Sequence, residues 1–156
     1  MARLTQMFNI LSQARDLLNT CQINEPPVDL AKLARKQQIR EIRVEDSVLN
    51  GELRRLKSGG YLVRLDARDS EERRRFTLAH EIAHTFLMSD SKDSAGGDCQ
   101  NAEVEDLCNF AAAELLVPDK LLRRTETSRL GDSARNQLLN EVPREPWADA
   151  TDACAT

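Results

Sequence analysis

The sequence has few aromatic residues, few cysteines and no long apolar run. Phe, Trp and Tyr make up 4% of the 156 residues, and the four cysteines include no Cys-x-x-Cys pair. Neither a thiolate zinc site nor a disulfide framework is therefore indicated. No apolar run approaches the roughly 20 residues that span a bilayer, and Arg3, Arg15 and Asp16 interrupt the segment where a signal peptide has its apolar core. We expect a cytoplasmic protein with no membrane partner.

Basic and acidic side chains are nearly balanced in number. The chain carries 22 basic and 26 acidic side chains, a formal net charge of −4, whereas a general nucleic-acid-binding protein is more basic. We therefore expect no direct contact with nucleic acid. The length and the 40% apolar content are typical of one compact domain, which we place at residues 1–142. Residues 143–156 contain two prolines and no periodicity, and are expected to form a disordered tail.

Hydrophobic periodicity predicts an α+β fold. Apolar positions recur every three or four residues over 4–18, which is typical of an amphipathic helix, and a second helix is expected over 29–38 after the Pro26-Pro27 pair. From residue 39 to 65 the period changes to two, with a Gly59-Gly60 turn. This pattern predicts a small three-stranded antiparallel sheet.

The second half of the chain is predicted to be mainly helical. A helix is expected from Ser70 to Met88, with Asp69 or Ser70 as its N-cap, and another over 101–117 that Pro118 ends. The polar segment 89–100 is predicted to be a loop, and shorter helices are expected over 119–124 and 132–141. The predicted fold is therefore a small antiparallel sheet packed with a helical bundle.

The chain has only two histidines, His80 and His84, in the segment HEIAH of the predicted 70–88 helix. Four residues advance a helix by about 400°, so both imidazoles project from one face, as two ligands of a single metal ion require. Glu81 lies about 100° around the helix from His80, where its carboxylate can take a proton from a metal-bound water. The alternative is a pair of helix histidines that pack or face solvent without metal.

A catalytic zinc ion takes three protein ligands and leaves one position open, so the chain must supply a third ligand for one Zn²⁺. Asp90 follows His84 by six residues, the spacing of one class of zinc peptidases, but Leu87 stands where the turn of that class needs glycine. Two imidazoles and a carboxylate also accept Mn²⁺, Fe²⁺ or Co²⁺.

Glu103 and Glu105 are the other candidates for the third ligand. Both open the predicted 101–117 helix, and two residues apart they point to nearly opposite faces, so only one can be used. Glu105 shares a small and polar stripe with Cys108 and Asn109, which suits packing against a metal-bearing helix. We therefore favour Glu105, whose other role would be to complement the helix dipole.

Two segments together resemble the ImmA/IrrE family of bacterial and phage metallopeptidases: RRFTLAHEIAHTFL (74–87) and EDLCNFAAAELLVP (105–118). The resemblance covers about residues 20–122 and extends to the layout of the predicted helix and strands upstream. It implies that zinc is bound by His80, His84 and Glu105, and that Glu81 is the general base. It also places Asn109 on the motif asparagine of the family, within reach of the site.

Members of the family cleave, or otherwise relieve, a helix-turn-helix repressor that controls a mobile element or a stress response. The resemblance therefore implies a zinc endopeptidase with an XRE-type repressor protein as its substrate. The alternative is a non-catalytic anti-repressor or toxin–antitoxin partner that binds the repressor and keeps zinc for structure. Glu81 favours catalysis, because a binding protein needs no general base.

Three further features have both a functional and a structural interpretation. Residues 60–66 could offer a strand edge to an extended substrate, or form an ordinary hairpin strand. Tyr61 could donate to the oxyanion, or simply pack on the sheet. Cys108 could touch the metal or respond to oxidation, but a small buried thiol is the favoured interpretation.

Overall fold

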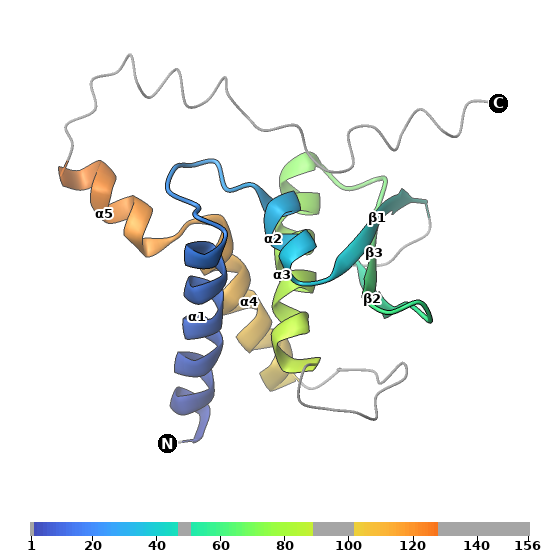
Figure 1. Ribbon diagram of the computed structural model, residues 1–156, viewed down its shortest axis with the longest axis horizontal. Coiled ribbons are helices and arrows are strands. Elements are labelled where there is room, and N and C mark those ends of the chain that lie inside the picture. Colours follow the sequence, from blue (N-terminus) through green and yellow to red (C-terminus); the bar gives the residue numbers. More distant parts are fainter. Residues whose placement is uncertain (1, 47–50, 89–101, 128–156) are drawn as a thin grey trace, which may run out of the picture.

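The computed structural model describes residues 2–46, 51–88 and 102–127, which contain five helices and three strands (Figure 1). The helices are α1 (Ala2–Thr20), α2 (Leu30–Lys36), α3 (Glu71–Met88), α4 (Ala102–Leu116) and α5 (Asp119–Thr127), and the strands are β1 (Ile39–Glu45), β2 (Glu52–Arg55) and β3 (Tyr61–Asp66). The predicted α+β class is confirmed. Asp90, the loop 89–100, the helix expected over 132–141 and the tail expected over 143–156 lie outside the described residues.

The sheet has the strand order β1-β3-β2 and is mixed. β2 and β3 form the expected antiparallel hairpin, with Leu53 opposite Val63, but β1 runs parallel to β3, with Ile42 opposite Val63. The prediction of a purely antiparallel sheet was therefore wrong. A period of two identifies a strand but carries no information about the direction of its neighbour.

The middle position of β3 decides between the two interpretations of residues 60–66. β3 pairs with a neighbour on each side, so it is an ordinary sheet strand and does not offer an edge to a substrate. The burial of Leu62, Val63 and Leu65 agrees with this central position. Among the described strands, β1 and β2 are the outer ones.

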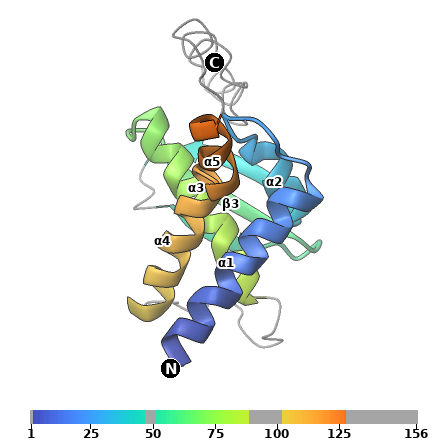
Figure 2. The same ribbon diagram turned by 90° about the vertical axis from the view of Figure 1, so that its left-hand side faces the viewer.

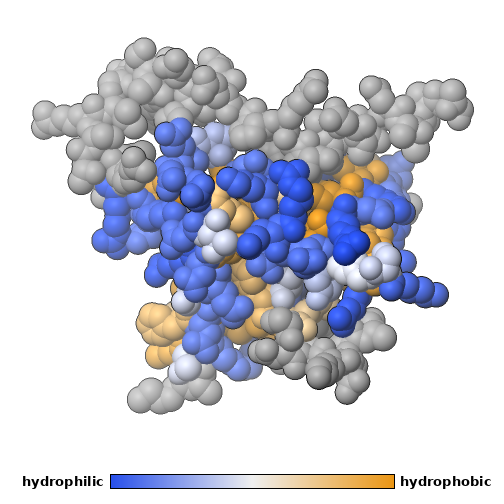
Figure 3. Space-filling view, in the orientation of Figure 1, coloured by the Kyte–Doolittle hydropathy of each residue, from blue (hydrophilic) through white to orange (hydrophobic). Residues whose placement is uncertain are grey.

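Helix α3 lies between the sheet and the other long helices (Figure 1). One side of it contacts β2 and β3 and the other contacts α4, while α1 runs beside α4 (Figure 2). Leu78 and Ile82 of α3, Leu65 of β3 and Leu115 of α4 are all inaccessible to solvent and belong to one core. Hydrophilic side chains cover most of the face shown in Figure 3. No helix among the described residues is long and apolar enough to cross a membrane.

Polar side chains begin two of the helices. Asp29 is the N-cap of α2 and accepts a hydrogen bond of 3.0 Å from the backbone N–H of Lys32, so the helix begins at this cap rather than at the proline pair. At α3, Ser70 Oγ accepts from the backbone N–H of Arg73 at 3.3 Å. Ser70 is thus the cap of the helix that carries both histidines.

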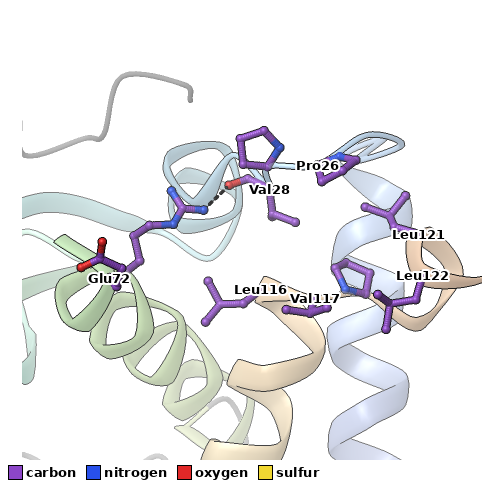
Figure 4. A pocket seen from close by; sticks show the side chains of 10 residues that line it. Pro26, Val28, Glu72, Leu116, Val117, Leu121 and Leu122 are labelled. Carbon is purple, nitrogen blue, oxygen red and sulfur yellow. Dashed lines mark hydrogen bonds between the residues drawn. The ribbon is translucent and has the colours of Figure 1, made fainter. Parts of the chain in front are cut away.

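An apolar groove of about 430 Å³ lies beside the start of α2 (Figure 4). It is lined by Val28, by Leu116 and Val117 at the end of α4, and by Leu121 and Leu122 of α5. The guanidinium of Arg75 on α3 donates to the Val28 carbonyl at 3.0 Å, and burial lowers the pKa of Arg75. This arginine therefore ties the segment before α2 to the helix of the histidines.

Candidate metal centre

His80 and His84 lie one turn apart on α3 and face the same way, as their spacing predicts. Their ring centroids are 4.8 Å apart, and their Nε2 atoms are 3.0 Å apart. Both side chains are largely buried, with exposed fractions of 12% and 13%. The two nitrogens therefore converge on one point at the edge of the core.

Glu105 reaches the same point from the first turn of α4. Its Oε2 lies 3.1 Å from His80 Nε2, and its Oε1 lies 3.4 Å from His84 Nε2. The three donors together form a group that could hold a metal ion. Ligand atoms around a tetrahedral zinc with bonds near 2.05 Å are about 3.3 Å apart, so the donor set and its spacing fit zinc. Glu103 is exposed and is not part of this group.

The Nδ1 atoms of both rings, called the outer nitrogens here because they face away from Glu105, contact side chains of α4. His80 Nδ1 lies 3.0 Å from Asn109 Oδ1, an oxygen that can only accept. When Nε2 of His80 binds a metal, Nδ1 is the protonated nitrogen and donates to this oxygen. His84 Nδ1 lies 3.5 Å from Cys108 Sγ. When Nε2 of His84 binds a metal, Nδ1 is the protonated nitrogen and donates to the sulfur.

Asn109 therefore lies within reach of the site, where the sequence places it. Cys108 contacts the nitrogen of His84 that is not turned toward Glu105. Its buried side chain agrees with the favoured interpretation of a small buried thiol. The contact with the imidazole was not predicted, although the stripe shared by Glu105, Cys108 and Asn109 could have indicated it.

Glu81 places its carboxyl group inside the protein beside the histidines, with an exposed fraction of 5%. Burial, and to a smaller extent the negative charges of Glu105 and Glu52, together raise the pKa of this carboxyl to about 8. Burial and the neighbouring His80 lower the pKa of His84, against the effect of Glu105. A neutral His84 is the form that binds a metal, and a cation in the site favours the ionised form of Glu81.

Gly51, at the start of β2, approaches this carboxyl closely. It has a φ of +81°, and a Cβ atom added there would lie 2.3 Å from Thr77 Cγ2 and 3.1 Å from Glu81 Oε1. Sequence reasoning missed this residue. An isolated glycine at a strand end was the available signal, since it often marks a close approach of the backbone.

Tyr61 lies at the turn end of the β2–β3 hairpin, whereas Gly51 contacts Glu81 at the open end. In the β2–β3 register it is opposite Arg55, whereas Arg64 is opposite Glu52. Three residues along a strand correspond to about 10 Å. Tyr61 is partly buried and packs against the core, and the contacts of the described residues do not connect it to the histidines.

Comparison with known proteins shows which family the chain resembles. The sequence model of the peptidase family described as the IrrE N-terminal-like domain matches residues 34–142. The radiation response metalloprotease IrrE of Deinococcus deserti is 37% identical over 99 residues, which are 60% of this chain and 34% of that protein. The protein of the same name from Deinococcus radiodurans is 36% identical over 88 residues, 53% of this chain and 26% of that protein.

The matched region thus spans only about a third of one relative and about a quarter of the other. The family match, in contrast, extends over more than half of this chain and contains both histidines, Glu81 and Glu105. The chain therefore belongs to the ImmA/IrrE family of metallopeptidases, through an IrrE N-terminal-like domain.

Proposed function

We propose that this chain is a zinc-dependent endopeptidase that cleaves a helix-turn-helix repressor of the XRE type and so relieves repression of a stress-response or mobile-element operon. The observation that carries the proposal is the convergence of His80, His84 and Glu105 beside the buried carboxyl of Glu81. The name of the two Deinococcus relatives, radiation response metalloprotease, supports peptidase chemistry and a stress setting.

The roles of the residues follow from their positions. His80 and His84 would hold a zinc ion through Nε2, and Glu105 would hold it through a carboxylate oxygen. A zinc ion held there would supply Lewis-acid chemistry, because it would polarise the scissile carbonyl and lower the pKa of a water molecule so that the water can lose a proton and attack. Glu81 accepts the proton of that water on its carboxylate and passes it to the nitrogen of the leaving amine. Asn109 and Cys108 keep the two imidazoles in the tautomer and orientation that the metal requires.

The sheet supplies a place for an extended segment of the repressor. β2 is an outer strand, and its first residue follows Gly51, which lies against Glu81. A peptide added to the outer edge of β2 by main-chain hydrogen bonds would pass close to the general base. Main-chain hydrogen bonds give affinity for a peptide of almost any sequence. Selectivity for the repressor would then come from contacts with the rest of the repressor.

Cleavage of a repressor encoded beside this gene tests the proposal. The zinc-loaded protein should cut the repressor at one site, whereas Glu81→Gln should leave it intact while binding the same amount of zinc. Glu71→Gln is the matched control, because Glu71 stands exposed in the first turn of the same helix, and it should cut at the parent rate. Binding of the repressor without cleavage by the parent would overturn the peptidase proposal in favour of a repressor-binding protein.

A further inference from the structure

The backbone at the start of β2 closes over the general base. Gly51 packs against Thr77 and Glu81 on one side, and the Arg64 carbonyl of β3 lies 3.7 Å from the position of its absent Cβ. We propose that Gly51 is a positioning residue for Glu81: only a residue without a side chain lets this strand hold the carboxyl in place against α3. The inference rests on the proposed role of Glu81 as the general base.

Thr77 is the residue that a side chain at position 51 would meet first. Thr77 is buried, and its Oγ1 donates to the Arg73 carbonyl at 2.9 Å. Because Thr is branched at Cβ, this hydrogen bond also fixes the position of Cγ2. A methyl group 2.3 Å from that atom cannot be accommodated without movement of the backbone or of the helix.

The strand is not free to move away from α3. Arg64 of β3 donates to Glu52 Oε2 of β2 at 2.7 Å and to Glu45 Oε2 of β1 at 2.7 Å. One partly buried guanidinium thus links all three strands directly beside Gly51. Charge-assisted pairs of this kind hold a local geometry well. The part of α3 that carries Thr77 and Glu81 is therefore what must give way, and the carboxyl of Glu81, at 3.1 Å from the position of the added Cβ, moves with it.

Gly51→Ala should consequently displace the base and leave the three metal ligands in place. A displacement of about 1 Å can reduce a rate roughly 100-fold, so we expect kcat for repressor cleavage to fall about 100-fold. The zinc content should stay at that of the parent. KM should change little, since the outer edge of β2 still pairs with the substrate.

Gly59→Ala is the matched control. Gly59 has a φ of +84°, almost the same as Gly51, but nothing lies within 4 Å of the position of its Cβ. Both variants therefore carry a similar left-handed backbone strain, and only the residue at position 51 meets α3. Gly59→Ala should retain the parent kcat.

A rescue experiment separates positioning from simple destabilisation. Thr77→Ser removes Cγ2, the atom 2.3 Å from the added methyl group, and keeps the hydroxyl that donates to Arg73. In the Gly51→Ala background it should restore kcat at least tenfold, and it should also recover a folded protein if Gly51→Ala alone fails to fold. A double variant that is folded, holds zinc and remains as slow as Gly51→Ala would overturn the proposal.

A binding measurement gives a readout that does not depend on turnover. Acetohydroxamate binds zinc through two oxygens and offers a donor to a neighbouring carboxylate, so its affinity for the zinc-loaded protein reports the position of Glu81. Titration calorimetry should show about tenfold weaker binding to Gly51→Ala than to Gly59→Ala. Equal affinities, or loss of zinc by a Gly51→Ala protein that is folded, would overturn the proposal.

The Glu81→Gln variant, measured in parallel, shows which idea has failed. If Glu81→Gln cleaves the repressor normally, the proposed function is wrong and the role of Gly51 falls with it. If Glu81→Gln is inactive while Gly51→Ala cleaves as fast as Gly59→Ala, the proposed function stands and the role of Gly51 alone is wrong.

Discussion

Glu81 holds its carboxyl group in surroundings that disfavour negative charge. The group is buried, and Glu105 and Glu52 add negative charges nearby, so its pKa rises to about 8. Burial and His80 lower the pKa of His84, which keeps that imidazole available as a ligand near neutral pH. Both groups favour a divalent cation between them. The cation stabilises the ionised form of the Glu81 carboxyl, and it binds the neutral form of the His84 imidazole.

The raised pKa of Glu81 predicts a pH dependence of stability in the metal-free protein. Between pH about 4.5 and about 8 the Glu81 carboxyl keeps its proton in the folded state and releases it in the unfolded state. The free energy of unfolding of the parent therefore falls as pH rises through this range. Glu81→Gln has no charge to bury. Its free energy of unfolding relative to the parent should therefore increase with pH, by up to about 1.4 kcal/mol for each pH unit.

Urea denaturation at pH 5, 6, 7 and 8 with a chelator present measures this difference. Glu71→Gln serves as the control, and its difference from the parent should stay constant over the same range. A difference between parent and Glu81→Gln that does not change with pH would show that the carboxyl is not buried as described.

The contacts of the outer ring nitrogens predict a graded effect on metal affinity. Asn109→Ala removes the acceptor 3.0 Å from His80 Nδ1 and should weaken zinc binding by about 10- to 100-fold. Cys108→Ala should have a smaller effect, because sulfur is a weak acceptor and lies at 3.5 Å. Competition with a chromophoric chelator gives both affinities.

The exposed neighbour Phe110 provides the control for that series. Phe110→Ala should bind zinc as the parent does. An Asn109→Ala variant with the affinity of Phe110→Ala would contradict the role given to the amide oxygen.

At this scale the helical period predicts the common face of the two histidines, whereas Glu105 was favoured from the stripe it shares and from the family resemblance. His80 and His84 share a face of any helix, and Glu105 leads a stripe compatible with packing on that face. Gly51 and the contact of Cys108 could not be predicted in the same way. They depend on how β2 and α4 dock against α3, which no local pattern encodes.

At the scale of elements, strand direction is the main difference between expectation and structure. The Gly59-Gly60 turn specifies the antiparallel pairing of β2 with β3 locally, with both glycines at positive φ. β1 reaches the opposite edge of β3, through a connection that includes β2, and lies parallel to it. This arrangement leaves β2 as the outer strand next to α3, where the proposed substrate edge lies.

The cap of α2 predicts a local stability effect. Asp29 accepts a hydrogen bond from the backbone of Lys32, so Asp29→Ala should lower the free energy of unfolding by about 1 kcal/mol. Asn caps helices as well as Asp does, and Asp29→Asn should keep most of that stability. Equal stability of Asp29→Ala and Asp29→Asn in urea denaturation would contradict the assignment of this cap.

At the scale of the whole molecule, α3 carries both residues of the candidate metal site and residues of the hydrophobic core. The helix places its histidines toward α4, while Leu78 and Ile82 on the same helix are fully buried. The site is therefore built on a helix that buried side chains anchor in the core, which suits a geometry that must be held within a fraction of an ångström.

This central position predicts that replacing a core leucine by alanine lowers the free energy of unfolding much more than replacing a surface leucine. Leu78→Ala should lower the free energy of unfolding by about 2 to 5 kcal/mol, the usual range for a fully buried leucine. Leu122 on α5 is 49% exposed, and Leu122→Ala should change stability by less than about 0.5 kcal/mol. Similar losses for the two variants would contradict the described core.

The central claim is that α3 and α4 together hold one metal ion through His80, His84 and Glu105. The most direct test is the metal content per chain, measured by mass spectrometry on protein purified without added metal or an affinity tag. We expect about one zinc in the parent and in Glu103→Ala, whose side chain lies outside the site, and a clear loss in Glu105→Ala. A parent that holds no metal even when zinc is supplied, or a Glu105→Ala variant that keeps the full amount, would contradict the account.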